Sequence, residues 1–454
     1  MRYFKKTFIW IFILTLLAGY SYIDLKREKI LEKKKDEATR LLPFESNQVL
    51  KIQIKKTESD IELERWEEGW KLIKPVQAPA VNEEVEKFIR YATDFRNDSD
   101  YIMDPSPTEE RLKEFGLDKP EVAVTLFVGR DMKPHTILFG NRAPTKGVAF
   151  ARIEGNPKVY RVLADAKAEA DQNVYYFRDK KIVNYNIAMI DQLEVSSPSG
   201  VIRCELPMDG KWRIVEPVSA KADIPQIMEL FTVFKNGEIK EFIEEEPKDL
   251  VQYGLQSEAQ KISFRISGDA ASTNQVLLGA RDKKKRGVFA RIGTRKNVVL
   301  LDDKLLDYIP TEPFAIMNKE IFSFEEEGVQ RIALFSGATQ WEFVKKPDFS
   351  WEQTAPSAKT VDFNPIMAFL QAARKWRIQK FIPGNPALFK SSGLDRPAYK
   401  AAFWMKDAKD EEWMAIGDKA GEEGFYAMSA NGQDIFVIGH EAEQNIKYFL
   451  GEMK

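Results

Sequence analysis

The chain of 454 residues contains one cysteine and two histidines, and these scarcities exclude several kinds of site. The single Cys204 cannot form an intramolecular disulfide or supply a cysteine-built zinc or iron–sulfur centre. With only His135 and His440, a metal centre made of several histidines is excluded as well. Neither histidine lies in a catalytic motif, so ordinary surface or capping roles are the better interpretation. The sequence indicates no cofactor.

An excess of charge of either sign is also missing. The chain has 68 Lys and Arg against 70 Asp and Glu, which gives a formal net charge of −2. A nucleic-acid-binding protein is normally basic overall, so we expect no nucleic-acid partner. The composition, 44% hydrophobic and 30% charged, is typical of globular proteins, and the length corresponds to about three domains.

One long apolar run is present, at the N-terminus. Residues 8–23 are apolar except for Thr15, Gly19 and Ser21, and basic residues precede them. As a helix this segment spans about 24 Å, slightly less than the hydrocarbon core of a bilayer. A cleaved signal and an uncleaved anchor are the two alternatives. The poor cleavage pattern around Ala18 favours an N-terminal membrane anchor over residues 1–23.

Residues 24–45 are expected to form a charged helical stalk. Seven Lys and Arg and five Asp and Glu lie within residues 24–40, whereas three basic residues precede the apolar run. Counted by the positive-inside rule, this argues against a cytoplasmic N-terminus. The interspersed acids and the short basic head, typical of a signal, favour the opposite orientation. We therefore expect a single-pass protein of the inner or cytoplasmic membrane with an extracytoplasmic, periplasmic body.

The rest of the chain repeats itself. A glycine before a leucine recurs at intervals of 138 and 139 residues, and a second glycine, a hairpin tryptophan and a Phe/Tyr-Ala strand follow the same spacing. The glycine markers are Gly116, Gly254 and Gly393, then Gly140, Gly279 and Gly417. Because many anchors recur in one order, we predict three tandem repeats, near residues 46–186, 187–325 and 326–454.

Each copy shows the same series of elements. An alternating strand such as Ile52–Ile54 opens the copy, and a hairpin follows. A helix with apolar residues at i, i+3, i+4 and i+7 comes next, with Asn82, Asp223 and Asn364 as the expected N-caps. Short β segments then predict an antiparallel meander. The expected fold is α+β: three repeats, each an antiparallel sheet with helices packed on one side, after a transmembrane helix.

These motifs together resemble a bacterial family catalogued as domain of unknown function 4340. The resemblance covers most of residues 46–325 and, more loosely, the third copy, where Met428 replaces the arginine of Arg152 and Arg291. Members are often encoded beside ABC transporters of the gliding-motility type. The resemblance therefore implies an envelope protein whose partners are components of such a transporter. The family has no assigned catalytic residues, so none are carried over.

One loop of the meander differs in charge between the copies. Residues 141–146, 281–286 and 418–423 carry net charges of +2, +4 and −2. The second of these is a candidate partner-contact loop, suited to anionic lipid, glycan or an acidic protein. Its basic residues are Arg281, Lys283, Lys284, Lys285 and Arg286. The alternative is sequence drift in an exposed hairpin loop.

Aromatic residues and carboxylates supply the remaining candidates. Five of the nine tryptophans lie in the third copy, and Trp376, Trp404 and Trp413 form a candidate aromatic surface, with core packing as the alternative. The acid runs 244–246 and 325–327 suggest a carboxylate-based hydrolase. Their position at element ends favours solvated loops instead.

The sequence thus predicts a non-enzymatic, membrane-anchored extracytoplasmic accessory or scaffold protein, associated with an ABC-type transport complex. Two alternatives remain. One is an envelope glycan- or peptide-binding module, which exposed third-copy tryptophans would support. The other is a carboxylate-based hydrolase, which would need a deep acidic cleft at a repeat junction.

Overall fold

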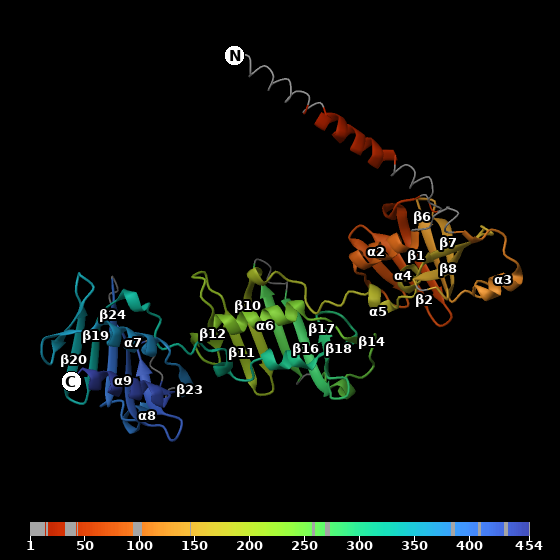
Figure 1. The fold of residues 1–454 in the computed structure, drawn as a ribbon. Coiled ribbons are helices and arrows are strands. Elements are labelled where there is room, and N and C mark those ends of the chain that lie inside the picture. Colours follow the sequence, from red (N-terminus) through yellow and green to blue (C-terminus); the bar gives the residue numbers. More distant parts are fainter. Residues whose placement is uncertain are drawn as a thin grey trace, which may run out of the picture. The chain divides into compact units, whose positions relative to one another are not determined.

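The chain folds into three antiparallel sheets of nine strands each, with the same strand order in all three (Figure 1). This computed structural model describes residues 14, 17–31, 42, 44–93, 102–145, 147–256, 259–267, 273–382, 386–406, 410–430 and 435–453. The chain divides into two compact units. One comprises residues 1–181 and 240–245, and the other comprises residues 182–239 and 246–454.

The N-terminal part is described only in pieces. Residues 17–31 form an exposed helix. Within the described residues, no helix is both long enough and apolar enough to span a membrane. Most of the predicted anchor, residues 1–13 and 15–16, lies outside the described residues, and so do residues 32–41 and 43 of the predicted stalk.

The first sheet shows how each copy is built. Its strands are β1 (Val49–Lys56), β2 (Asp60–Trp66), β3 (Gly69–Lys74), β4 (Ala78–Pro79), β5 (Ile102–Asp104), β6 (Val122–Val128), β7 (Lys133–Arg142), β8 (Val148–Ile153) and β9 (Val159–Leu163). Their order across the sheet is β4-β3-β2-β1-β6-β7-β8-β9-β5. The opening hairpin and the meander therefore meet at the central β1–β6 pair, where Ile52 is opposite Leu126 and Ile54 is opposite Val124.

The other two sheets repeat this order. The second contains β10 (Ile190–Ser197), β11 (Gly200–Glu205), β12 (Arg213–Glu216), β13 (Ala220–Lys221), β14 (Glu241–Glu244), β15 (Gln260–Ile266), β16 (Thr273–Asp282), β17 (Gly287–Ile292) and β18 (Val298–Asp302). The third contains β19 (Val329–Ser336), β20 (Thr339–Lys345), β21 (Trp351–Ala355), β22 (Lys359–Val361), β23 (Ile378–Ile382), β24 (Tyr399–Met405), β25 (Glu412–Lys419), β26 (Phe425–Ser429) and β27 (Ile435–Ile438). The shared order supports the predicted α+β class and the repeated organisation.

Short and long helices connect the strands. The α-helices are α2 (Asn82–Thr93), α3 (Glu109–Glu114), α4 (Ala164–Ala170), α5 (Val174–Phe177), α6 (Ile224–Asn236), α7 (Phe363–Arg374), α8 (Pro386–Ser391) and α9 (His440–Glu452). The 3-10 helices are η1 (Ser46–Gln48), η2 (Ile187–Met189), η3 (Val251–Tyr253), η4 (Asp303–Tyr308), η5 (Pro313–Ile316) and η6 (Glu326–Gly328).

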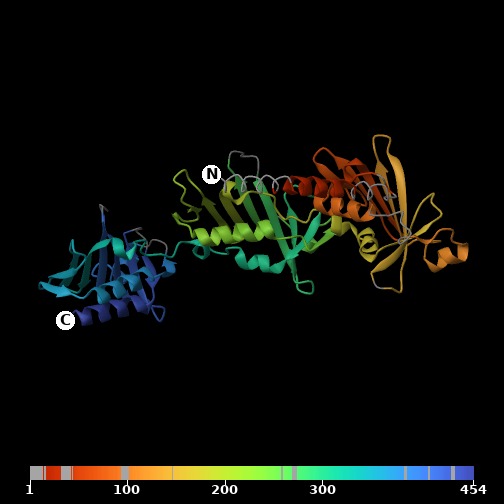
Figure 2. The ribbon, with the colours of Figure 1, turned by 45° about the horizontal axis from the view of Figure 1, so that its top comes forward.

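The helix after the hairpin covers one face of each sheet. Figure 2 shows α6 lying along the face of the second sheet. In α2 the buried residues are Val85, Phe88, Ile89 and Ala92, which is the predicted i, i+3, i+4, i+7 stripe. In the third copy α7 and α9 share this face, and Phe369 stacks on Phe449 with ring centroids 4.5 Å apart. The main apolar core of each copy thus lies between the long helices and one face of the sheet. The opposite face, called the open face below, carries no long helix. In the first copy a small buried cluster of Phe115, Leu117, Phe150 and Val159 packs on part of it.

The predicted helix starts are partly correct. Asp223 is the N-cap of α6, and its side chain accepts a hydrogen bond from the backbone N of Gln226 at 3.2 Å. Asn82 is the first residue of α2, where its Oδ1 accepts a hydrogen bond from the backbone N of Trp70. The prediction for Asn364 is wrong, because α7 already begins at Phe363 after the N-cap Asp362.

Candidate functional site

The six marker glycines build a structural joint in each copy. Gly116, Gly254 and Gly393 have φ angles of 66°, 65° and 69°, in the left-handed region that glycine adopts without strain. Each lies shortly after a helix, namely α3, η3 or α8. The leucine that follows each of them is buried. This turn therefore ends a helix and inserts a leucine into the fold.

The second glycine of each pair lies on a neighbouring strand and leaves room for the backbone of the same turn. A Cβ atom at Gly140, Gly279 or Gly417 would be 2.1 Å from the backbone oxygen of Phe115, Tyr253 or Ser392, respectively. In the first copy, the backbone N of Asn141 donates to that same oxygen of Phe115 at 2.7 Å. These glycines are required for close packing and carry no chemistry of their own.

The arginine of the Phe-Ala-Arg strand also has a structural partner. Arg152 Nε donates to the carbonyl of Asn156 at 3.1 Å, and Arg291 Nη2 donates to the carbonyl of Arg295 at 3.4 Å. Each arginine thus holds the turn that follows its strand. Met428 occupies the corresponding position in the third sheet, and the turn residues 431–434 lie outside the described residues.

The basic loop joins β16 to β17. The side chains of Arg281 and of residues 283–286 are exposed. Asp282 fixes the turn, because its Oδ1 accepts hydrogen bonds from the backbone N of Lys284 at 2.9 Å and of Lys285 at 3.0 Å. Arg286 has a left-handed φ of 50°. An ordered turn therefore presents these cations to solvent.

Trp376 does not belong to an exposed aromatic surface, and this part of the prediction is wrong. Its side chain is 1% exposed, and its Nε1 donates to Asn445 Oδ1 of α9 at 3.0 Å. Its ring also contacts Phe322 and Phe369, with centroids 6.0 Å away in both cases. Trp376 follows the C-terminal end of α7 and lies in the core between α7, α9 and the sheet.

Trp404 and Trp413 lie on the open face of the third sheet. Their neighbours in β24 and β25, Phe403 and Met414, point into the core, so the tryptophans face the other way. Both are half-buried. The Arg331 guanidinium lies 4.3 Å from the Trp404 ring, and Lys400 Nζ lies 4.8 Å from the Trp413 ring. The sequence analysis did not identify these two cations as neighbours of the tryptophans. For Lys400 a signal was present, because the alternation of Lys400, Ala402 and Trp404 along one strand places them on the same face.

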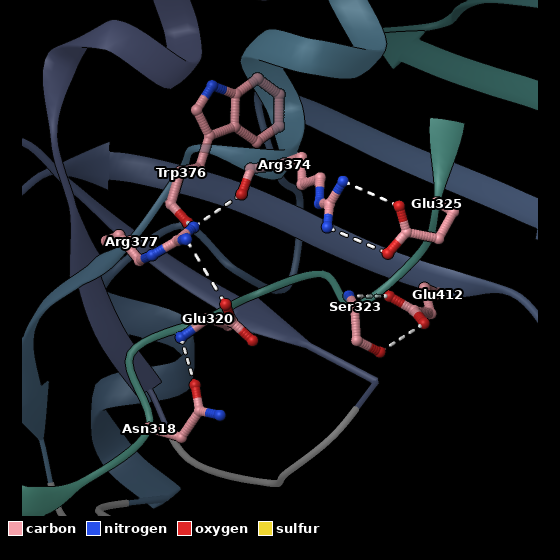
Figure 3. Close-up of polar contacts among 8 residues, drawn as sticks. All are labelled: Asn318, Glu320, Ser323, Glu325, Arg374, Trp376, Arg377 and Glu412. Carbon is pink, nitrogen blue, oxygen red and sulfur yellow. Dashed lines mark hydrogen bonds and ion pairs between the residues drawn. The ribbon is translucent and has the colours of Figure 1, made fainter. Parts of the chain in front are cut away.

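The segment before the third sheet is fastened by polar contacts (Figure 3). Arg374 of α7 forms a bidentate ion pair with Glu325, with N–O distances of 2.9 and 3.0 Å, and also contacts Glu326 at 3.2 Å. Glu412 accepts hydrogen bonds from the backbone N of Ser323 at 2.9 Å and from its hydroxyl at 3.0 Å. The intervening apolar residues Ile321, Phe322 and Phe324 are buried in the third core.

The two acid runs are engaged in ion pairs. The carboxylates of Glu325, Glu326 and Glu327 lie within 4.8 Å of one another. The Arg374 guanidinium lies against two of them, which accounts for their proximity without a metal ion. In the other run, Glu245 accepts from Arg178 Nη2 at 2.8 Å, and the Arg178 guanidinium lies 3.5 Å from the Phe242 ring.

The histidines and the cysteine occupy structural positions. His135 is half-buried in β7, with its ring centroid 5.0 Å from that of Phe44. Burial, followed by the charge of Lys133, lowers the pKa of His135. His440 is the first residue of α9, and its Nε2 lies 3.1 Å from the carbonyl oxygen of Glu422. Cys204 is buried in β11, and burial raises the pKa of its thiol to about 12.

Comparison with known proteins gives one finding. The model of a family described as domain of unknown function (DUF4340) matches residues 70–206 and again residues 212–362, together more than half of the chain. The first match begins within β3 and the second just before β12, the equivalent strand, and each ends just after a strand of the next sheet, β11 or β22. No curated protein and no solved structure matches the chain. The two successive matches follow the period of the glycine and tryptophan markers, and the chain belongs to the DUF4340 family.

Proposed function

We propose that the protein is a non-enzymatic, membrane-anchored accessory or scaffold protein that presents its three sheets outside the cytoplasm to components of an ABC-type transport complex. The observation that carries the proposal is the contrast between the two faces of the sheets. The helix-covered faces are alike in the three copies, whereas the open faces differ in chemistry.

The helix-covered faces share one pattern. The equivalent helices bury apolar residues at the same four positions: Val85, Phe88, Ile89 and Ala92 in α2, Ile227, Leu230, Phe231 and Phe234 in α6, and Ile366, Phe369, Leu370 and Ala373 in α7. Such buried stripes hold a helix against a sheet at about 25 cal/mol for each Å² of apolar surface removed from water. This face maintains the fold.

The open faces can be compared position by position through the strand pairing. Three residues in register across the central strands are Gln53, Thr125 and Thr136 in the first sheet. The equivalent residues are Glu194, Ser263 and Gln275 in the second sheet, and Ala333, Ala402 and Trp413 in the third. At these three positions one architecture thus carries neutral polar, partly acidic and partly aromatic side chains. Three different surfaces on one repeated support favour several contacts with a partner over one shared reaction.

The transporter link and the membrane anchor rest on other grounds. The family resemblance implies an envelope protein encoded near ABC transporters, and the apolar run at residues 8–23 follows a basic head. The ordered basic loop after β16 adds a cationic surface, and each basic side chain near an anionic membrane contributes about 1 kcal/mol of attraction.

The test is site-specific photo-crosslinking of the full-length protein in membranes. A photoreactive amino acid would replace Ala123, Lys261 or Lys400, which occupy equivalent places on the three open faces. Glu83, Lys235 and Gln371, exposed on the outer sides of α2, α6 and α7, are the matched controls. We expect permease or ATPase subunits to be captured from at least one open face and not from the controls. Equal capture from both sets, or capture without any transporter subunit, would contradict the proposal.

A further inference from the structure

The open face of the third sheet has an aromatic residue at a central position where the other two sheets have polar residues. Trp413 replaces Thr136 of the first sheet and Gln275 of the second. Ala333 and Ala402, beside it in register, are 0% and 1% exposed although they face away from the helices. Larger side chains beside them on this face, such as Trp413 opposite Ala402, account for this burial. The result is an aromatic platform over small residues.

Two cations border this platform. Arg331 lies over the Trp404 ring and is paired with Glu342, with Nε 2.6 Å from the carboxylate oxygen. Lys400 Nζ lies between the rings of Trp413 and Phe335, 4.8 and 6.0 Å from their centroids. In the described part of the chain, no carboxylate is within ion-pair distance of Lys400, so its charge is balanced only by contacts with aromatic rings. The platform therefore combines aromatic rings with one available cation.

We propose that this platform, formed by Trp404, Trp413, Phe335 and Lys400, binds an acidic glycan. The apolar faces of sugar rings would stack on the two indoles, and Lys400 would pair with a sugar carboxylate. The site is independent of the proposed transporter association, because it uses one sheet face and needs no second protein.

The strand order argues against an extended peptide as the ligand. β24 and β25 are interior strands, each paired on both sides, so their backbone groups cannot accept an added strand. Recognition must therefore come from side chains alone. An aromatic ring offers a flat apolar surface that suits a sugar ring, and such rings concentrate binding energy where they are partly desolvated.

The charge selects among glycans. A neutral saccharide offers Lys400 only hydroxyl oxygens as acceptors, whereas a uronic acid brings a carboxylate that can form an ion pair with this ammonium group. Charge-assisted hydrogen bonds to a carboxylate are stronger than those between neutral groups. We therefore expect a preference for polymers of uronic acids over neutral sugars of the same shape.

The experiment measures binding of oligogalacturonate and oligomannuronate to the full-length protein by isothermal titration calorimetry. Methyl-esterified oligogalacturonate, which keeps the sugar and loses the charge, is the paired ligand. The variants are Trp404→Ala, Trp413→Ala and Lys400→Gln. Trp66→Ala is the matched control, because Trp66 is an exposed tryptophan of the first sheet with Lys71 Nζ 4.3 Å from its ring.

We expect an acidic oligosaccharide to bind, and each tryptophan variant to weaken binding at least about tenfold, as loss of a central aromatic contact does. Lys400→Gln should weaken binding and remove the preference for the acid over its ester. Trp66→Ala should change neither. The Lys400 variant keeps the test valid if a tryptophan variant fails to fold, because it alters a side chain at the sheet surface.

Three results would overturn the proposal. One is that the folded protein binds neither acidic oligosaccharide. Another is that Lys400→Gln leaves both the affinity and the preference for the acid unchanged. The third is that polyglutamate binds as tightly as the oligosaccharides with the same dependence on Lys400, which would show a site for acidic peptides.

Discussion

Gly279 of β16 lies directly against the backbone carbonyl of Tyr253, so that a Cβ atom at this glycine would be 2.1 Å from the carbonyl oxygen. The same approach recurs at Gly140 and Gly417. The contact joins the turn after η3 to the meander, and neither partner can move without disturbing its own hydrogen-bonded element.

Replacing Gly279 with alanine should therefore destabilise the protein by about 1–3 kcal/mol, the usual cost of forcing an extra carbon into a packed site. Gly328→Ala is the control, because no heavy atom lies within 4 Å of the added Cβ and its φ is not left-handed. The measurement is urea-induced unfolding of both variants. Equal midpoints for the two would show that the close approach is not a constraint.

The segment 321–324 should be held on the third sheet by apolar burial more than by ion pairs. Phe322 is 2% exposed among Phe324, Trp376 and Phe403, and Phe322→Ala should cost about 3–5 kcal/mol. The Arg374 side chain is 42% exposed, so solvent screens its ion pairs and Arg374→Ala should cost less than about 1 kcal/mol. Unfolding free energies of both variants check the ranking. A larger loss for Arg374→Ala would reverse it.

The basic loop should be dispensable for stability. Changing Lys283, Lys284 and Lys285 to serine removes exposed charges and keeps the turn fixed by Asp282, so the melting temperature should change little. If the loop meets an anionic membrane, binding to vesicles containing phosphatidylserine should weaken, and the difference from wild type should shrink as salt rises.

The matched control for this loop is the triple change of Lys375, Lys390 and Lys406 to serine. These three lysines are exposed but dispersed over the third copy, so the control has the same net charge and no cluster. If the two triple variants bind vesicles equally, the clustering of charge in the loop does not matter and only the net charge of the protein does.

His135 should make the stability of the first sheet depend on pH. Burial lowers its folded-state pKa from the ordinary value of 6.5, so the unfolded chain takes up a proton more readily. The stabilising effect is complete above the unfolded pKa and is lost as the pH falls below it. His135→Phe keeps the ring beside Phe44 but cannot titrate.

The measurement is the melting temperature of wild type and His135→Phe at pH 7.5 and pH 5. The wild type should lose more stability than the variant between the two values, since all other titrating groups are common to both. Parallel losses would mean that His135 is equally easy to protonate in the folded protein.

The sequence predicted the repeated sheets well, because the features it repeats are those that packing requires. Gly116 and Gly140 recur because a left-handed turn and a close approach tolerate little else, and Trp70 recurs as Trp212 and Trp351, all three of which are buried. Periodicity also located the buried stripe of the long helix after each hairpin. These signals are local, so one sequence is enough to see them.

Features that depend on tertiary placement were missed. Trp376 follows a helix, where neither helical nor strand periodicity says which way a side chain points, and only the position of α9 shows that it is buried. The contact of Lys400 with Trp413 depends on the register of β24 with β25, which the alternation within a single strand does not reveal. Asn364 gave a capping signal identical in kind to that of Asp223, and yet the N-cap of α7 is Asp362, two residues earlier.

The position of the strand that follows each long helix has a consequence for cutting the chain. β5 pairs with β9, and β23 with β27, so each sheet is completed at its far edge by a strand from the first half of its own copy. A fragment with the ends of the family match, 70–206, would lack β1 and β2 and would carry β10 and β11 without their sheet. The backbone of β6 would be left unpaired on one side, and so would the edges of the isolated β10–β11 hairpin. Chains aggregate through unpaired strand edges of this kind. Soluble pieces of this protein should instead begin before the opening strand of a sheet and end after its last.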